Sequence, residues 1–157
     1  MAVNRRLEDY VPFVGEEIVD QIRLMARHLQ GAQVQHINST RQGGGVAEIL
    51  SSLVPLMNDI GLEAEWTVME GPESFFDVTK TFHNGLHGEP VEVTDEMLDI
   101  YRKVTVQNAP ILRLDADFVI AHDPQPLGLV DFRGNHYSKW VWRCHIDVAG
   151  ADRSVWA

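Results

Sequence analysis

Apolar residues recur along the chain in two patterns, one with helical spacing and one made of short continuous runs. Between Val14 and Leu29 apolar side chains return every three or four residues, which predicts an amphipathic helix that ends before Gly31. Its expected apolar stripe consists of Val14, Ile18, Ile22, Met25 and Leu29. Similar spacing predicts helices at residues 46–60, 72–86 and 94–108. The short runs predict strands at residues 34–38, 64–69, 118–121 and 140–147.

The predicted strands and helices alternate. A strand, a crossing helix and a second strand form a βαβ unit, and successive units build a mostly parallel sheet. We therefore expect an α/β fold with a Rossmann-like open parallel sheet and helices on both faces. No internal repeat, low-complexity tract or interior linker divides the sequence, so residues 1–157 are expected to form one domain.

Charge and composition narrow the classes of partner. The 157 residues include 23 acidic and 13 basic side chains, which gives a formal net charge of −10. A negative field of this size disfavours nucleic acids and anionic membranes as partners. No apolar run reaches the roughly 20 residues of a membrane helix. Cys144 is the only cysteine, so no internal disulfide can form, and we expect a protein of the reducing cytoplasm.

Polar side chains follow three of the predicted strands. Open parallel sheets bind ligands outside the carboxyl ends of their strands, so these side chains are candidate site residues. They are His36, Asn38 and Ser39 before a glycine turn, His122 and Asp123, and His145 and Asp147. A further cluster, from His83 to Gly88, follows a predicted helix and is expected to form a loop.

The first of these ends leads into Gly43, Gly44 and Gly45, directly before a predicted helix. Consecutive glycines let the backbone approach a ligand closely, and a helix N-terminus attracts phosphate. Glu48 stands where the dinucleotide fingerprint G-x-G-x-x-G requires a glycine, so that fingerprint is not met. The turn is therefore either a phosphate-binding backbone or a flexible connection without a ligand.

Two other strand ends offer side chains for chemistry. His122 and Asp123 precede two prolines that stiffen the turn, and the imidazole can hydrogen-bond a sugar hydroxyl or be satisfied by neighbouring backbone. Arg143 needs an anionic partner if it is buried in its strand, either Asp117 or Asp147 or a ligand phosphate. The seven histidines match no metal-ligand spacing, so no metal site is expected.

Several long strings, taken in order, resemble trehalose glycosyltransferring synthases. The strings are His36-Ile37-Asn38-Ser39-Thr40, Gly43-Gly44-Gly45-Val46-Ala47-Glu48, Phe82-His83-Asn84, His122-Asp123-Pro124-Gln125-Pro126 and Trp142-Arg143-Cys144-His145-Ile146-Asp147. The resemblance extends from about Leu7 to the end of the chain. That family resembles retaining GT-B glycosyltransferases, in which two Rossmann-like domains face one another across a cleft, and trehalose phosphorylases are similar to it.

The resemblance implies a function for this chain. Members of the family transfer glucose from a nucleotide diphosphate glucose to glucose and form trehalose, without a further cofactor. It implies that His122, with Asp123 beside it, contacts the transferred sugar, and that Gly43, Gly44 and Gly45 lie near the donor. The other residues that it places at the acceptor side of the cleft are Lys80, His83, Asn84, Arg143, His145 and Asp147.

The resemblance also implies a second domain with the nucleotide pocket, which we expect to be absent from this chain. An N-terminal, acceptor-side domain that binds glucose or trehalose and is inactive by itself is therefore the first interpretation. A non-catalytic binding or regulatory module of the same fold, which associates with a partner chain or with itself, is the second. A part of a trehalose phosphorylase and a dinucleotide-dependent enzyme, with Glu70 as its ribose ligand, are further alternatives.

Overall fold

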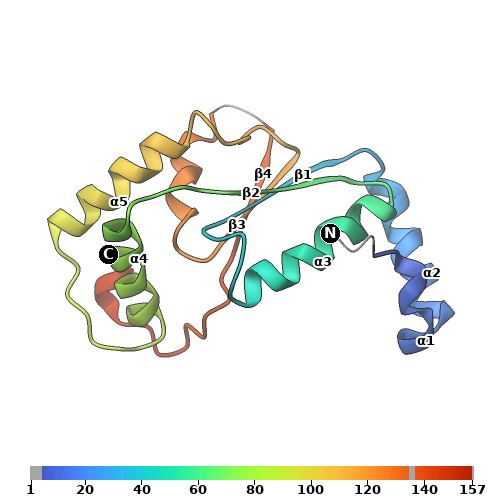
Figure 1. Ribbon diagram of the computed structural model, residues 1–157, viewed down its shortest axis with the longest axis horizontal. Coiled ribbons are helices and arrows are strands. Elements are labelled where there is room, and N and C mark those ends of the chain that lie inside the picture. Colours follow the sequence, from blue (N-terminus) through green and yellow to red (C-terminus); the bar gives the residue numbers. More distant parts are fainter. Residues whose placement is uncertain (1–4, 135–136, 157) are drawn as a thin grey trace.

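Four parallel strands form the centre of the protein, in the order β2–β1–β3–β4 (Figure 1). They are β1 (Gln33–Asn38), β2 (Glu63–Val68), β3 (Phe118–His122) and β4 (Lys139–Arg143). The computed structural model describes residues 5–134 and 137–156, so residues 1–4, 135–136 and 157 of the expected domain lie outside the described ranges.

Helices cover both faces of this sheet. The longer ones are α2 (Glu16–Ala26), α3 (Gly45–Asp59), α4 (Glu73–Leu86) and α5 (Asp95–Asn108), with one short turn of helix, α1 (Val11–Val14). Short 3₁₀ helices form η1 (Leu7–Tyr10), η2 (Arg27–Leu29), η3 (Leu127–Phe132) and η4 (Arg153–Val155). In Figure 1, α2 and α3 lie to one side of the sheet and α4 and α5 to the other. The predicted α/β, Rossmann-like fold is confirmed.

The alternation of side chains along the strands builds a core on each face. Val34 of β1 packs toward Met57 and Ile60 near the end of α3, together with Phe118 and Ile120 of β3. On the opposite face, Ile37 and Val119 pack with Leu129 of η3 and with apolar residues that follow α5. His36 shares the α3 face with Val34, because the two residues are two positions apart in β1.

The first predicted helix differs from the observed one. Gly15 (φ 83°) separates α1 from α2, which ends at Ala26. Within the expected stripe, Val14, Ile18 and Met25 are 44%, 43% and 64% exposed. The helix instead turns Val19 and Ala26 inward, at 1% and 4% exposed. The predicted buried stripe is therefore wrong. The helix has more than one row of apolar side chains, and the packing decides which row faces the sheet.

One predicted strand end and one predicted loop are also wrong. The last strand stops at Arg143 instead of Asp147, because its partner β3 has already ended at His122 and the chain beyond has no strand to pair with. Helix α4 ends at Leu86, as predicted, and it includes His83 and Asn84 in its last turn, so the loop expected to begin at His83 is wrong. In contrast, Thr94 accepts a hydrogen bond from the N–H of Met97 and caps α5, a helix predicted to begin there.

Candidate functional site

The strand order reverses between β1 and β3. From β1 the chain crosses through α3 to β2, and it later returns to pair β3 with the opposite edge of β1. Ligands of open α/β sheets bind outside the carboxyl ends of the strands at such a switch point. Because β1 ends at Asn38 and β3 at His122, the residues around these two positions form the candidate site.

Three histidine rings form a hydrogen-bonded chain across this switch point, which we call the histidine chain. Nδ1 of His36, in β1, lies 3.0 Å from Nε2 of His122, at the end of β3. Nδ1 of His122 lies 2.9 Å from Nε2 of His145, which follows β4. Successive ring centroids are 5.3 Å and 5.2 Å apart, so the rings also stack. The histidine chain thus links three strands at their carboxyl ends.

The two ends of the histidine chain have different surroundings. His36 and His122 are each only 1% exposed, whereas His145 is exposed to solvent. At the buried end, Nε2 of His36 lies 3.3 Å from Sδ of Met57, which comes from α3. The histidine chain therefore begins at a partly buried methionine and ends at the surface of the candidate site.

Burial keeps the two inner histidines neutral. Loss of hydration lowers the pKa of His36 to about 4, with a smaller contribution from the positive charge of Arg143. The pKa of His122 falls to about 3, first through burial and then through His36, His145 and Arg143. At neutral pH each inner ring therefore has one N–H donor and one nitrogen lone pair.

Asp123 holds the outer histidine in place. Its Oδ1 accepts a 2.8 Å hydrogen bond from the backbone N–H of His145, and its carbonyl accepts one from Nε1 of Trp142. Its own N–H donates to the carbonyl of Arg143. With φ at 63°, Asp123 has the only left-handed backbone among the described non-glycine residues. Such strain persists where the surroundings over-determine it and is concentrated at functional sites.

The glycine turn forms a second part of the candidate site. Gly43 and Gly44 have φ of 74° and 88°, so both positions need a glycine, and Gly45 begins α3. A pocket of about 510 Å³ lies over this turn, with Arg41 and Glu48 on its walls. The N-terminus of α3 favours an anion here, and Glu48 in its first turn opposes one.

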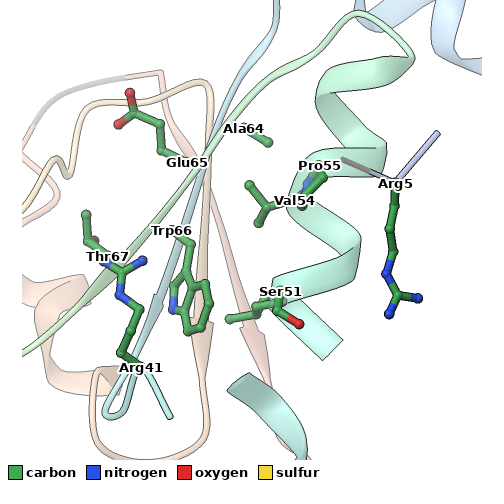
Figure 2. A pocket seen from close by; sticks show the side chains of 10 residues that line it. Arg5, Arg41, Ser51, Val54, Pro55, Ala64, Glu65, Trp66 and Thr67 are labelled. Carbon is green, nitrogen blue, oxygen red and sulfur yellow. The ribbon is translucent and has the colours of Figure 1, made fainter. Parts of the chain in front are cut away.

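A neighbouring pocket of about 610 Å³ lies between β2 and α3 (Figure 2). Its central side chain is Trp66, whose Nε1 donates a 2.7 Å hydrogen bond to Oδ1 of Asn38. The guanidinium of Arg41 lies 4.7 Å from the centroid of the Trp66 ring, and Ser51 lines the pocket from α3. Arg41 and Ser51 also line the pocket over the glycine turn, so the two hollows are adjacent.

The remaining predicted site residues are placed less closely together. Lys80 and His83 are exposed on α4, and Asn84 donates to the side chain of Glu89. Arg143 is exposed at the end of β4 and makes no ion pair within the described residues, so the expected buried pair is wrong. Asp117 instead accepts from the N–H of Gln33. Asp147 is exposed and accepts from the N–H of Ala149.

Sequence reasoning missed part of the candidate site. His36 was noted at a strand end but was not assigned a role, and nothing in the pattern of α3 distinguishes Met57 from other core residues. The available signal was one histidine in or directly after each of two predicted strands. In the part of the chain described by the structure, no group of three or more His, Cys, Asp or Glu residues is arranged to hold a metal ion.

The turn after Asp123 is fixed from α5. The hydroxyl of Tyr101 donates to the carbonyl of Pro124 and accepts from the N–H of Gly128, both at 2.8 Å. Burial raises the pKa of Tyr101 to about 12, so the hydroxyl stays protonated and can make both bonds. This contact anchors the segment between β3 and η3 and with it the backbone of Asp123.

Comparisons with known proteins agree with the sequence resemblance. Residues 36–157 match the family described as trehalose synthase, N-terminal domain. A trehalose synthase of Pyrococcus horikoshii is 50% identical over 155 residues, which cover 98% of this chain and 37% of that protein. A trehalose synthase of Thermococcus litoralis is 45% identical over 158 residues, with the same coverage of 98% and 37%.

A more distant relative carries a different name. A trehalose phosphorylase of Pleurotus pulmonarius is 27% identical over 157 residues, 90% of this chain and 21% of that protein. The chain thus spans less than two fifths of the length of the relatives that it matches. The family match includes His36, the whole glycine turn, His122, Asp123 and His145. On these grounds, the chain belongs to the family of trehalose synthase N-terminal domains.

Proposed function

We propose that this chain is the acceptor-side, N-terminal domain of a retaining glycosyltransferase that transfers glucose from a nucleotide diphosphate glucose to glucose and so forms trehalose. The observation that carries the proposal is the position of the histidine chain and the glycine turn at the switch point of a trehalose synthase domain. Polar groups that converge at such a point are the usual basis of a small-molecule site.

The proposal gives the two parts of the candidate site different ligands. The glycine turn has free backbone amides at the start of α3 and lies near the phosphates or the sugar of the donor. The histidine chain presents His145 to a sugar, while His122 supports His145 from behind and Asp123 fixes its backbone. The exposed Lys80, His83, Arg143 and Asp147 are further candidates for the walls of the cleft.

We further propose that the chain by itself binds sugar weakly and transfers little glucose. In the reaction, the bond between the glucosyl carbon and the donor phosphate breaks, and a bond to the acceptor hydroxyl forms. The donor phosphate takes the proton of that hydroxyl. Stabilising the departing diphosphate requires cationic groups on both sides of it, and orientation requires both walls of a cleft. The relatives have much more chain to provide the second wall.

An NMR titration of the isotope-labelled chain tests the proposal. Glucose, trehalose, a panel of nucleotide diphosphate glucoses and NAD are added in turn. We expect shifts from the sugars at Gly43–Gly45, His122 and His145, and none there from NAD. His145→Ala should abolish the sugar shifts, whereas His28→Gln, at an exposed position in η2, should leave them unchanged.

Two outcomes would count against the proposal. If a folded sample shows no shift with any sugar, the chain does not form an acceptor site, and the interpretation as a non-catalytic binding module gains support. Robust glucosyl transfer by the purified chain would contradict its proposed inactivity.

The same chain should be tested for phosphorolysis of trehalose, because distant relatives are named trehalose phosphorylases. The higher identity to the synthases favours synthesis.

A further inference from the structure

We infer that Met57 fixes the tautomers of the whole histidine chain and thereby leaves Nδ1 of His145 as a bare hydrogen-bond acceptor at the candidate site. A neutral imidazole has one N–H and one lone pair, and each hydrogen bond between two rings needs one of each.

Only two arrangements satisfy both bonds when each of the three rings carries one proton. In the first, each ring carries its proton on Nε2, so that His145 donates to His122 and His122 donates to His36. In the second, each ring carries its proton on Nδ1 and both bonds point the other way. The inter-ring distances of 3.0 Å and 2.9 Å fit either arrangement, so a group at one end must select between them.

The outer end of the histidine chain does not favour either of the two proton arrangements. Nδ1 of His145 makes no hydrogen bond with the described residues, and the side chain is exposed, so water can donate to a lone pair or accept from an N–H there. The choice therefore falls to the buried end of the histidine chain.

The inner end of the histidine chain, at His36, favours one of the two proton arrangements. A thioether sulfur has lone pairs and no proton, so it can only accept. At 3.3 Å, Nε2–H of His36 can donate to Sδ of Met57, whereas an unprotonated Nε2 would place two lone pairs against one another. No water can replace the contact without entering a site where His36 is 1% exposed. Met57 thus requires the Nε2–H form of His36, and the two inter-ring bonds pass this requirement on to His122 and His145.

The consequence lies at the surface of the candidate site. Because His145 donates through Nε2 to His122, its Nδ1 carries the lone pair, and successive hydrogen bonds in one direction polarise each other. His145 therefore presents an acceptor that fits a hydroxyl donor. This step rests on the proposed function, in which that donor is a hydroxyl group of glucose or trehalose. Met57 acts only through the histidines and is a positioning residue.

The tautomers can be measured on the full 157-residue chain. Long-range proton–nitrogen correlation spectra of the ¹⁵N-labelled protein at pH 7.5 distinguish a protonated from an unprotonated ring nitrogen. We expect His36, His122 and His145 to show a protonated Nε2 and an unprotonated Nδ1. Met57→Leu keeps the volume and removes the acceptor, so it should bring both tautomers into the three spectra. Met25→Leu, at a methionine that is 64% exposed, is the matched control.

Two results would overturn the inference: a protonated Nδ1 on any of the three rings in the unchanged protein, or pure Nε2–H rings in a folded Met57→Leu variant. Replacing methionine by selenomethionine keeps an acceptor without a proton and should preserve the Nε2–H form.

Sugar titration separates this inference from the proposed function. If Met57→Leu populates the two tautomers equally, half of the molecules present the acceptor, and the Kd for trehalose should rise about twofold. Pure Nε2–H rings without any sugar shift at His145 would support the tautomer assignment and contradict the proposed function.

Discussion

The carboxylate of Asp123 accepts a 2.8 Å hydrogen bond from the backbone N–H of His145. This bond joins the end of β3 to the segment that follows β4, beyond the last pair of the strand ladder. It replaces a strand partner that His145 no longer has, and it sets the distance at which the His145 ring meets His122. Asp123, a residue with a left-handed backbone, thus holds the segment that carries His145 at the outer end of the histidine chain.

Three substitutions of Asp123 should separate the stabilising contribution of its hydrogen bond from the cost of its backbone strain. We expect Asp123→Ala to lower the free energy of unfolding by about 2–4 kcal/mol, since it loses a charged acceptor and keeps the left-handed φ. Asp123→Asn tolerates this φ and keeps an acceptor, so its loss should stay below about 1 kcal/mol. Asp123→Gly also loses the acceptor but relieves the strain, so its loss should fall between the other two. Urea unfolding measures all three, and equal losses would contradict this account.

The buried histidines should make stability depend on pH. Their pKa values, about 4 for His36 and about 3 for His122, lie below the 6.5 of an unfolded histidine. The unfolded chain therefore binds more protons as the pH falls below about 6.5. Stability is full above this pH and declines toward pH 4, by up to about 1.4 kcal/mol per pH unit for each ring.

Urea unfolding between pH 7.5 and 5 measures this decline. His36→Gln removes one of the two titrating rings and should reduce the slope by about half. The control, His28→Gln, changes an exposed ring and should leave the slope as it is. A slope that does not change in His36→Gln would show that His36 is not kept neutral by the fold.

The glycine turn should tolerate a side chain at one position and not at its neighbour. Gly44 has φ 88° and ψ 153°, a region that is essentially restricted to glycine. Nothing lies within 4 Å of a Cβ at Gly44 or Gly45, so any cost comes from the backbone alone. We expect Gly44→Ala to cost about 1–3 kcal/mol. Gly45→Ala, in the first turn of α3, should be neutral or slightly stabilising. Thermal unfolding distinguishes the two, and equal costs would show that the turn rearranges.

At Trp66, the hydrogen bond to Asn38 should contribute more to the free energy of unfolding than the contact between the ring and Arg41. Trp66→Phe keeps an aromatic ring but leaves Oδ1 of Asn38, a residue that is 3% exposed, without its donor. We expect a loss of about 1–3 kcal/mol. Arg41→Gln removes the contact between the guanidinium and the ring and should cost about 0.5–1 kcal/mol at this exposed position. Chemical unfolding of both variants checks the order, and a larger loss for Arg41→Gln would reverse it.

The class of fold and most of the helices and strands could be predicted from the amino-acid sequence. Alternation of short apolar runs with helical spacing predicted the parallel sheet, and β1, β2 and β3 lie within two residues of their predicted bounds. Such local patterns are reliable because backbone periodicity dictates which positions can share a face. The family was also readable from the sequence, because His122-Asp123 and the glycine turn belong to strings long enough to be specific.

Which side chains meet in the candidate site depends on how the helices and strands pack in three dimensions. Met57 and His36 are 21 residues apart, His122 lies 86 residues beyond His36, and the contacts between them depend on strand order and on the rotation of α3. The same holds for α2, which turns Val19 inward and leaves Met25 exposed. A sequence pattern specifies which positions of an element share a face. The fold, by packing elements against one another, selects the face that is buried and brings the polar groups of different strands within hydrogen-bonding distance.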